Sequence, residues 1–112
     1  MKKDNLVYLK HISDAILRIE DYTEGLKYED FMKNNLVQAG VMREITVIRE
    51  AAKRLTRDIR EKYSDIPWKK IAGMRDKLIH NYFDIKPEIA WKTVKEDIPK
   101  LKLEMTKLLK NR

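Results

Sequence analysis

The sequence predicts an all-α protein, an antiparallel four-helix bundle, from three observations. Apolar residues recur at intervals of three and four along most of the chain, which is the spacing of one helix face. Only three glycines and three prolines occur in 112 residues, too few for the turns that several short strands would need. With 43% apolar and 38% charged residues, the chain has the composition of amphipathic helices around one core. A single domain spanning residues 1–112 is expected.

Two helical regions are predicted in the first half of the chain. The first covers about residues 5–24 and should end at Gly25, because glycine readily adopts the left-handed conformation after a last helical turn. Asp30 offers a side-chain cap for a longer region that continues to about residue 63, with a bend near Gly40. The apolar faces of the two regions comprise Leu9, Ile12, Ile16 and Ile19, and then Val37, Val41, Ile45, Ile48, Ala52, Leu55 and Ile59.

Prolines mark the helices of the second half. Pro67 suits the first turn of a third helix over about residues 67–82, since proline has no N–H to leave unpaired there. Pro87 opens a fourth helix in the same way. Pro99 should kink this last helix or split it in two, with Asp97 as the new cap. The apolar face of the fourth helix comprises Trp91, Val94, Ile98, Leu101, Met105 and Leu108.

The composition restricts the function classes. A net charge of +7 favours a polyanionic partner, although the acidic and basic residues interleave as they do on an ordinary soluble surface. The absence of cysteine excludes disulfides and thiolate metal sites. The first residues do not show the apolar pattern of a secretory leader, and no apolar run is long enough for a membrane span, so we expect a cytoplasmic protein that does not contact membranes.

One segment carries residues suited to chemistry, namely Arg75, His80 and Tyr82. Histidine, with an ordinary pKa of about 6.5, can exchange a proton with a ribose 2′-hydroxyl or a leaving oxygen near neutral pH. Arginine can bind two phosphate oxygens and offset negative charge in a transition state. Phosphodiester cleavage by this pair needs no metal and no other cofactor, and His11 is the only other histidine.

Helix geometry leaves the role of this segment open. At about 100° per residue, Arg75, Ile79 and Tyr82 share a stripe, whereas His80 lies about 140° from Arg75. The pair therefore meets only if the helix end is distorted or a second chain closes the site. The residue types also fit a structural role, with Arg75 in a salt bridge, His80 at a cap or on the surface, and Tyr82 as an interfacial aromatic residue.

The chain resembles the HepT-like branch of the HEPN superfamily from about residue 49 to residue 103. The similar pieces are Arg-Glu-Ala-Ala-Lys-Arg-Leu at 49–55, Ile-Pro-Trp at 66–68, Gly-Met-Arg-Asp-Lys-Leu-Ile-His-Asn-Tyr-Phe at 73–83, Trp91, and Asp-Ile-Pro-Lys-Leu at 97–101. The signature of this family is an arginine, four residues, a histidine, one residue and a tyrosine. Arg75, His80 and Tyr82 match it without a gap.

The resemblance implies a HEPN-like bundle that forms a homodimer and cleaves RNA, either tRNA or mRNA, as a metal-independent endoribonuclease. Such toxins belong to type VII-like toxin–antitoxin systems, in which a cognate MNT-type nucleotidyltransferase is the antitoxin. By resemblance, Arg75 and His80 are the catalytic pair and Tyr82 is the residue that the antitoxin adenylylates. The alternative is a non-catalytic helical partner subunit of a nucleotidyltransferase.

Several neighbouring residues have two interpretations. The family commonly has glycine where this chain has Arg49, a position expected at a helix crossing or a dimer contact, and often asparagine where it has Asp76. Asp76 could raise the basicity of His80 or be an exposed carboxylate. Glu50 and Asn81 could line the cleft, although Asn81 also suits a helix-terminal hydrogen bond. Trp68 could stack on a base or pack across the helix junction.

Overall fold

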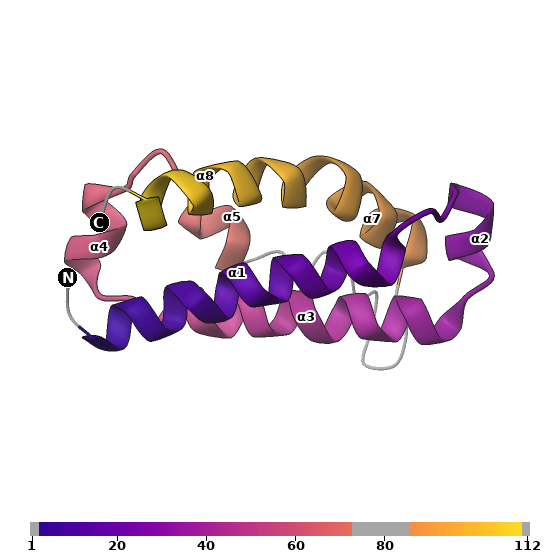
Figure 1. Ribbon diagram of the computed structural model, residues 1–112, viewed down its shortest axis with the longest axis horizontal. Coiled ribbons are helices and arrows are strands. Elements are labelled where there is room, and N and C mark those ends of the chain that lie inside the picture. The colour runs from indigo at the N-terminus through magenta and orange to yellow at the C-terminus, as the bar shows by residue number, and fades with distance from the viewer. Residues whose placement is uncertain (1–2, 73–85, 111–112) are drawn as a thin grey trace.

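The computed structural model describes residues 3–72 and 86–110, which form helices joined by short connections (Figure 1). The elements are α1 (Lys3–Thr23), α2 (Tyr28–Met32), α3 (Asn35–Arg54), α4 (Arg57–Lys62), α5 (Trp68–Ala72), α7 (Pro87–Lys92), the π-helical turn η1 (Thr93–Asp97) and α8 (Ile98–Lys110). These two ranges contain no strand, so the predicted all-α fold is confirmed. Within them, no helix has both the length and the apolar character needed to cross a membrane.

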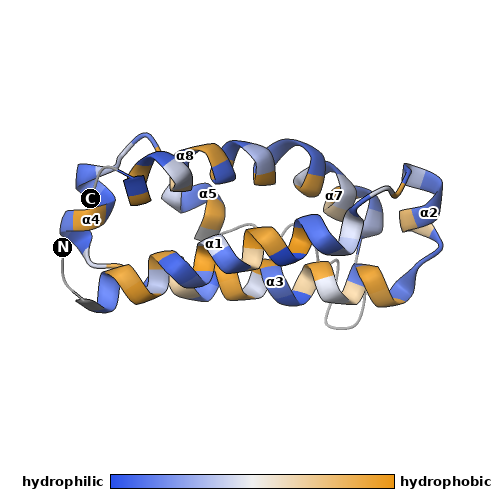
Figure 2. Ribbon diagram, in the orientation of Figure 1, coloured by the Kyte–Doolittle hydropathy of each residue, from blue (hydrophilic) through white to orange (hydrophobic). Residues whose placement is uncertain are grey.

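The long helices lie antiparallel to one another. α1 and α3 run side by side in opposite directions, and α2 joins them at one end of the molecule (Figure 1). α7, η1 and α8 form one continuous helical rod, which packs along α1 and runs antiparallel to it. Apolar and polar residues alternate around each long helix, as Figure 2 shows, so each has an apolar face to bury.

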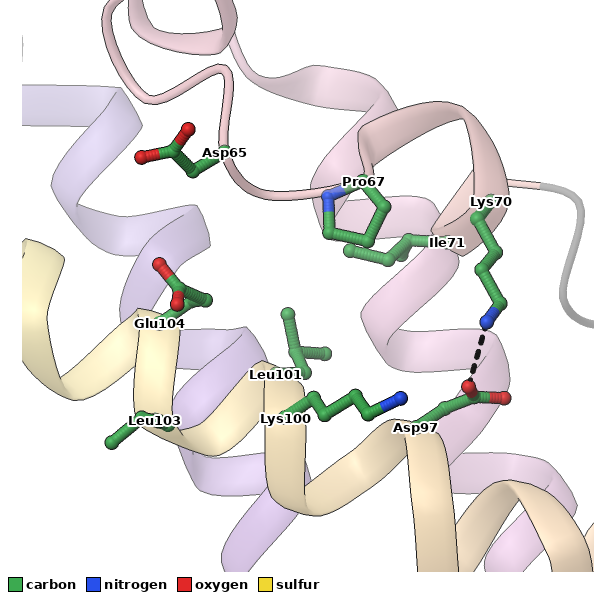
Figure 3. A pocket seen from close by; sticks show the side chains of 9 residues that line it. All are labelled: Asp65, Pro67, Lys70, Ile71, Asp97, Lys100, Leu101, Leu103 and Glu104. Atoms are coloured by element: carbon green, nitrogen blue, oxygen red, sulfur yellow. Dashed lines mark hydrogen bonds and ion pairs between the residues drawn. The ribbon is translucent and has the colours of Figure 1, made fainter.

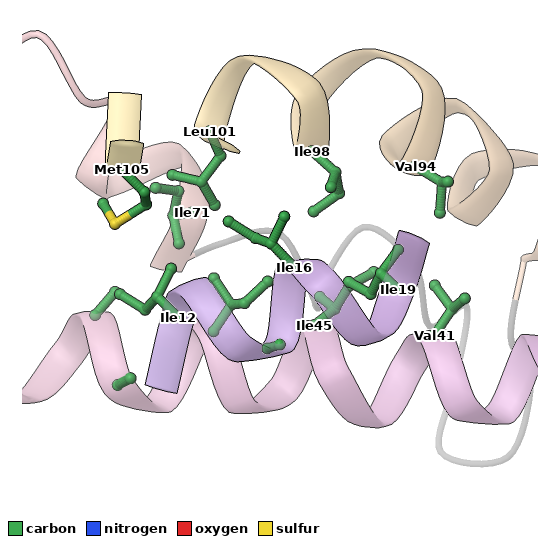
Figure 4. Close-up of a cluster of buried hydrophobic side chains, with 14 of the residues drawn as sticks. Ile12, Ile16, Ile19, Val41, Ile45, Ile71, Val94, Ile98, Leu101 and Met105 are labelled. Carbon is green, nitrogen blue, oxygen red and sulfur yellow. The ribbon is translucent and has the colours of Figure 1, made fainter. Parts of the chain in front are cut away.

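The core lies where the apolar faces of α1, α3 and α8 meet. Ile16 of α1, Ile45 of α3 and Ile98 of α8 are each at most 1% exposed (Figure 4). Burial of one such side chain stabilises the fold by roughly 1.5–3 kcal/mol. Every residue of the predicted apolar faces is buried except Val37 and Trp91, which are half-buried. The predicted helical periodicity is therefore confirmed.

The long region predicted up to residue 63 is divided into three helices. The first break follows α2, where the Asn34 side chain accepts a hydrogen bond from the Val37 N–H and caps α3. The buried Gln38 amide donates to the Phe31 carbonyl at the end of α2. Asp30 does not begin the long helix, because its carboxylate accepts a hydrogen bond from the Lys27 N–H and stabilises the start of α2.

The second break separates α3 from α4 and is held by the start of α1. The amide of Asn5 donates to the Thr56 hydroxyl at 2.8 Å and accepts from the Thr56 backbone N–H at 3.1 Å. Asn5 is 1% exposed, so both bonds are shielded from water. They fix Thr56 in an extended conformation, with ψ of 157°, which interrupts the helix.

The glycines have different roles in the connection and the packing of α1 and α3. Gly25 follows α1 with φ of +74°, as predicted. α3 continues through Gly40, where a Cβ atom would lie 3.1 Å from the Tyr22 ring. Gly40 therefore permits a close approach of the two helices.

Pro67 and Pro99 affect the helices in different ways. α5 begins at Trp68, one residue after the predicted start at Pro67, and the Trp68 indole N–H donates to the Tyr63 carbonyl across the junction. Residues 73–82 of the predicted third helix lie outside the described residues. The predicted irregularity near Pro99 takes the form of the π turn η1, where the Ile98 N–H donates to the Thr93 carbonyl. A π turn relieves the clash of a proline ring with the preceding turn without breaking the rod.

Candidate functional site

The predicted catalytic segment is flanked by two helices that pack on the same partner. Its predicted site residues, which lie outside the described residues, are Arg75, Asp76, His80, Asn81 and Tyr82. The flanking helices α5 and α7 both contact α3. Ile71 of α5 is 4% exposed and Ala90 of α7 is fully buried. The chain therefore enters and leaves segment 73–85 at helices anchored on the core.

Glu50 is the one predicted site residue within the described ranges. It lies near the end of α3, where it lines a hollow of about 310 Å³ that His11 of α1 also lines. Its carboxylate accepts a hydrogen bond of 2.8 Å from Arg49, and its side chain is 48% exposed. Arg49, by contrast, is 22% exposed, so this larger side chain is accommodated largely against the protein.

An ion pair links α5 to the last helical rod. Lys70 Nζ donates to Asp97 Oδ1 at 2.8 Å, as Figure 3 shows, and this hydrogen bond raises the pKa of Lys70. Asp97 thus lies inside a continuous rod and binds a neighbouring helix instead of capping a new one. The bond crosses one side of a pocket of about 410 Å³ with Ile71 and Leu101 among its walls. The ion pair thus connects α5 to the rod immediately before the predicted catalytic segment.

Glu44 is a buried carboxylate that the sequence analysis did not single out. It lies on α3 at 0% exposure and accepts three hydrogen bonds. The donors are Arg18 Nε at 2.8 Å, Arg43 Nη1 at 2.7 Å and the Tyr22 hydroxyl at 3.2 Å. Arg18 and Tyr22 come from α1, so this one carboxylate joins the two longest helices through side-chain hydrogen bonds.

The environment of Glu44 keeps it ionised. Burial by itself raises the pKa of this carboxyl, but the hydrogen bonds and charges of Arg18 and Arg43 outweigh burial and leave the pKa below its ordinary value. The position of Glu44 in the sequence is the signal that could have predicted its burial. Glu44 follows Val41 by three residues and precedes Ile48 by four, so it lies on the apolar face of the helix. A carboxylate at such a position requires hydrogen-bond donors or positive charges as partners.

Within residues 3–72 and 86–110, no three histidine or carboxylate side chains gather in a way that could hold a metal ion.

Comparison with known proteins places the chain in a family. A family model described as "Ribonuclease HepT-like" matches residues 12–108. The chain belongs to the HepT-like family. The match covers most of the 112 residues and includes both the buried Glu44 and segment 73–85.

Individual relatives support membership of the HepT-like family. A Thermococcus cleftensis protein named "Probable ribonuclease HepT" is 44% identical over 110 residues, which are 98% of this chain and 100% of that protein. A Methanocaldococcus jannaschii protein named "Gamma-glutamylcyclotransferase and putative RNase" is 46% identical over 109 residues, 97% of this chain but only 49% of that protein. This HepT-like chain thus spans about half of the second relative. The comparison with solved structures found no match.

Proposed function

We propose that this chain is a metal-independent endoribonuclease in which Arg75 and His80 act on one RNA phosphodiester. The supporting observation is the HepT-like match over residues 12–108, which contains the arginine, four residues, histidine, one residue and tyrosine of the family signature. Relatives that cover nearly the whole chain carry ribonuclease names. The net charge of +7 suits a polyanionic substrate.

The proposed reaction transfers the phosphoryl group from the 5′-oxygen to the neighbouring 2′-oxygen within the RNA backbone. His80, as a neutral imidazole, takes the proton of a ribose 2′-hydroxyl, and the 2′-oxygen forms a bond to the adjacent phosphorus. The bond from phosphorus to the 5′-oxygen breaks, and that oxygen leaves with a proton. Arg75 stabilises the negative charge that builds on the free phosphate oxygens. The products are a 2′,3′-cyclic phosphate and a 5′-hydroxyl, and no water or metal enters this step.

A dimer supplies the second acid–base group that a single motif lacks. The reaction uses a base for the 2′-hydroxyl and an acid for the leaving oxygen, but each chain has a single histidine in the motif. A two-fold dimer that brings two segments 73–85 together would provide both groups. The homodimer is therefore part of the proposal. The helices that flank the segment, α5 and α7, are anchored on α3, which gives each half of such a site a firm support.

Cleavage in the presence of a chelator tests the proposed reaction. Purified protein incubated with tRNA or mRNA in EDTA is expected to cut the RNA, because neither group of the catalytic pair depends on a metal. The fragments are expected to carry cyclic phosphate and 5′-hydroxyl ends, which end-specific enzymatic labelling can identify. Binding of RNA without cleavage would instead support a non-catalytic partner subunit and would contradict the proposal.

Regulation by adenylylation at Tyr82 is the second part of the proposal. Tyr82 is two residues from His80 and seven from Arg75 in the sequence. An attached AMP would bring a phosphate charge and a bulky base next to the residues that bind the scissile phosphate. The modified toxin would then repel RNA both by charge and by volume. The modifying enzyme would be a nucleotidyltransferase that acts as the antitoxin.

Mass spectrometry of the intact protein tests this modification. After co-expression with a nucleotidyltransferase encoded by a neighbouring gene, the wild-type chain is expected to gain AMP-sized increments and to lose cleavage activity. Tyr82→Phe should gain none, because it lacks the acceptor hydroxyl. Tyr28→Phe is the matched control, since Tyr28 is exposed on α2 and lies outside the family signature. Increments that persist in Tyr82→Phe would contradict the assignment.

A further inference from the structure

A basic groove lies beside the helix that leads into the predicted catalytic segment. It is formed by the end of α3, by α4 and by the start of α5, and it encloses about 570 Å³. Its basic side chains are Lys53, Arg57, Arg60 and Lys69, all of them exposed. These four cations come from three helices and converge on one hollow, unlike the interleaved charges elsewhere in the sequence.

Little negative charge opposes these cations. Glu61 is the only carboxylate among the described residues that line the groove, and it pairs with Arg57 across one helical turn at 2.8 Å. Both partners are exposed, at 87% and 65% of their side chains, so the pair contributes little stability and can exchange for a phosphate. Among the described residues, no carboxylate forms a salt bridge with Lys53, Arg60 or Lys69.

An oriented aromatic ring completes the groove. Trp68 is half-buried and packs against the core, yet its indole also lines the groove. The bond from its Nε1 to the Tyr63 carbonyl, at 3.2 Å, fixes the orientation of the ring. A ring held in this way offers stacking surface to a base at little cost in side-chain entropy. Both interpretations of Trp68 in the sequence are thus compatible, because a half-buried side chain packs on the core and still lines the groove.

We propose that this groove binds the backbone of single-stranded RNA, with one base against Trp68. Cations that follow the phosphates, combined with an aromatic ring for a base, are the combination that single-strand binding proteins use. Lys69 is six residues before Arg75 on the chain, so RNA held there would reach toward the catalytic segment. The inference rests on the proposed ribonuclease function and adds a second point of contact outside the Arg75 and His80 pair.

RNA fits the groove better than an acidic protein surface does. The four cations surround a hollow instead of a flat face, and carboxylates of a folded partner reach into a hollow less readily than a flexible phosphodiester chain does. A base can also stack on the indole of Trp68, whereas the carboxylates of an acidic protein surface cannot. An interface with a nucleotidyltransferase is therefore the alternative that the experiment must separate from RNA binding.

The test measures RNA binding without cleavage. A fluorescent single-stranded RNA oligonucleotide is titrated, at several salt concentrations, with the His80→Ala protein and with the same protein carrying Arg60→Gln and Lys69→Gln. We expect weaker binding for the groove variant. The slope of log K against log salt should also become shallower by about 1.4, since each contact to a single-stranded phosphate contributes about 0.7. A change in slope reports lost phosphate contacts and not a folding defect.

The matched control removes the same charge at the opposite end of the molecule. Lys27 and Lys33 are exposed on either side of α2, far from α4 (Figure 1). The variant with Lys27→Gln and Lys33→Gln is expected to keep the slope of the His80→Ala protein. Equal slopes for the groove and control variants would overturn the proposal. So would a groove variant that retains RNA binding but no longer co-purifies with a co-expressed nucleotidyltransferase.

Tryptophan fluorescence tests the contact with the base. The chain has two tryptophans, so Trp91→Phe in the His80→Ala background leaves Trp68 as the only indole. Saturating RNA is expected to quench its emission, and an unchanged emission would overturn the proposal. Because both measurements use an inactive protein, they are independent of the cleavage assay. Failure of the wild-type chain to cut RNA and failure of the groove to bind it are therefore separate results.

Discussion

Replacement of His80 by alanine is expected to lower the rate of RNA cleavage by at least about 100-fold, because a positioned general acid or base contributes about 10²–10⁴. In a dimer, the substitution removes the histidine from both motifs at once, so neither the base nor the acid remains. Arg75→Ala should lower the rate as well, since it removes the charge that stabilises the transition state. The rates are measured by gel electrophoresis of a labelled RNA in EDTA.

The second histidine of the chain provides the matched control. His11 is exposed on α1 and meets the Tyr8 ring edge-on, with 6.1 Å between ring centroids. His11→Ala is expected to retain wild-type cleavage. Sedimentation should show that the His80→Ala protein has the same mass as the wild type, so that lost activity reflects lost chemistry. Equal rates in His80→Ala and the wild type would refute the mechanism, and loss of activity only in His11→Ala would place the chemistry elsewhere.

Replacement of Glu44 by glutamine is expected to lower the free energy of unfolding by about 1.5–3 kcal/mol at neutral pH, the range for hydrogen bonds to a charged group. An amide cannot accept all three hydrogen bonds with the strength of the carboxylate, and it leaves the two arginines without a charge partner. The side chains of Arg18 and Arg43 are accessible to water, at 41% and 70%, so solvation limits the loss. Urea unfolding measures the difference. Glu29→Gln, the same change at an exposed glutamate, should change stability by less than about 0.5 kcal/mol.

The same substitution should alter the dependence of stability on pH. The pKa of Glu44 is lowered in the folded protein, so the unfolded chain binds this proton more readily. The stabilisation is therefore complete above the ordinary glutamate pKa of about 4.3 and is lost as the pH falls through the lower folded value. Wild-type stability should decline more steeply than that of Glu44→Gln below about pH 4.3. Parallel declines would show that the buried carboxylate is not held ionised.

The apolar periodicity predicted the helical fold well because burial decides it. Ile16, Ile45 and Ile98 lie on stripes that can be recognised without coordinates, and each is buried. Gly25 and Pro67 were also predictable, since their effects on backbone conformation are local. The family signature predicted segment 73–85 as the site of chemistry, and both this assignment and the roles of Arg75, His80 and Tyr82 stay predictions.

Other features depend on contacts between distant residues. Neither glycine nor proline marks the break at Thr56, where the Asn5 side chain binds the backbone from 51 positions away. Glu44 was counted among interleaved charges, because sequence alone does not show that Arg18 and Tyr22 of α1 face it. The basic groove was hidden for the same reason, since Lys53, Arg60 and Lys69 converge only after three helices have packed.

The contact between Asn5 and Thr56 makes the first turn of α1 a support of the proposed RNA-binding groove. α4 carries Arg57 and Arg60, and its orientation follows from the extended Thr56 that Asn5 holds. A protein shortened past Asn5, or fused at its amino terminus so that the first turn unwinds, would keep its core and yet present these two arginines differently. RNA binding would then be weakened by a change that is distant in sequence from the residues proposed to contact RNA.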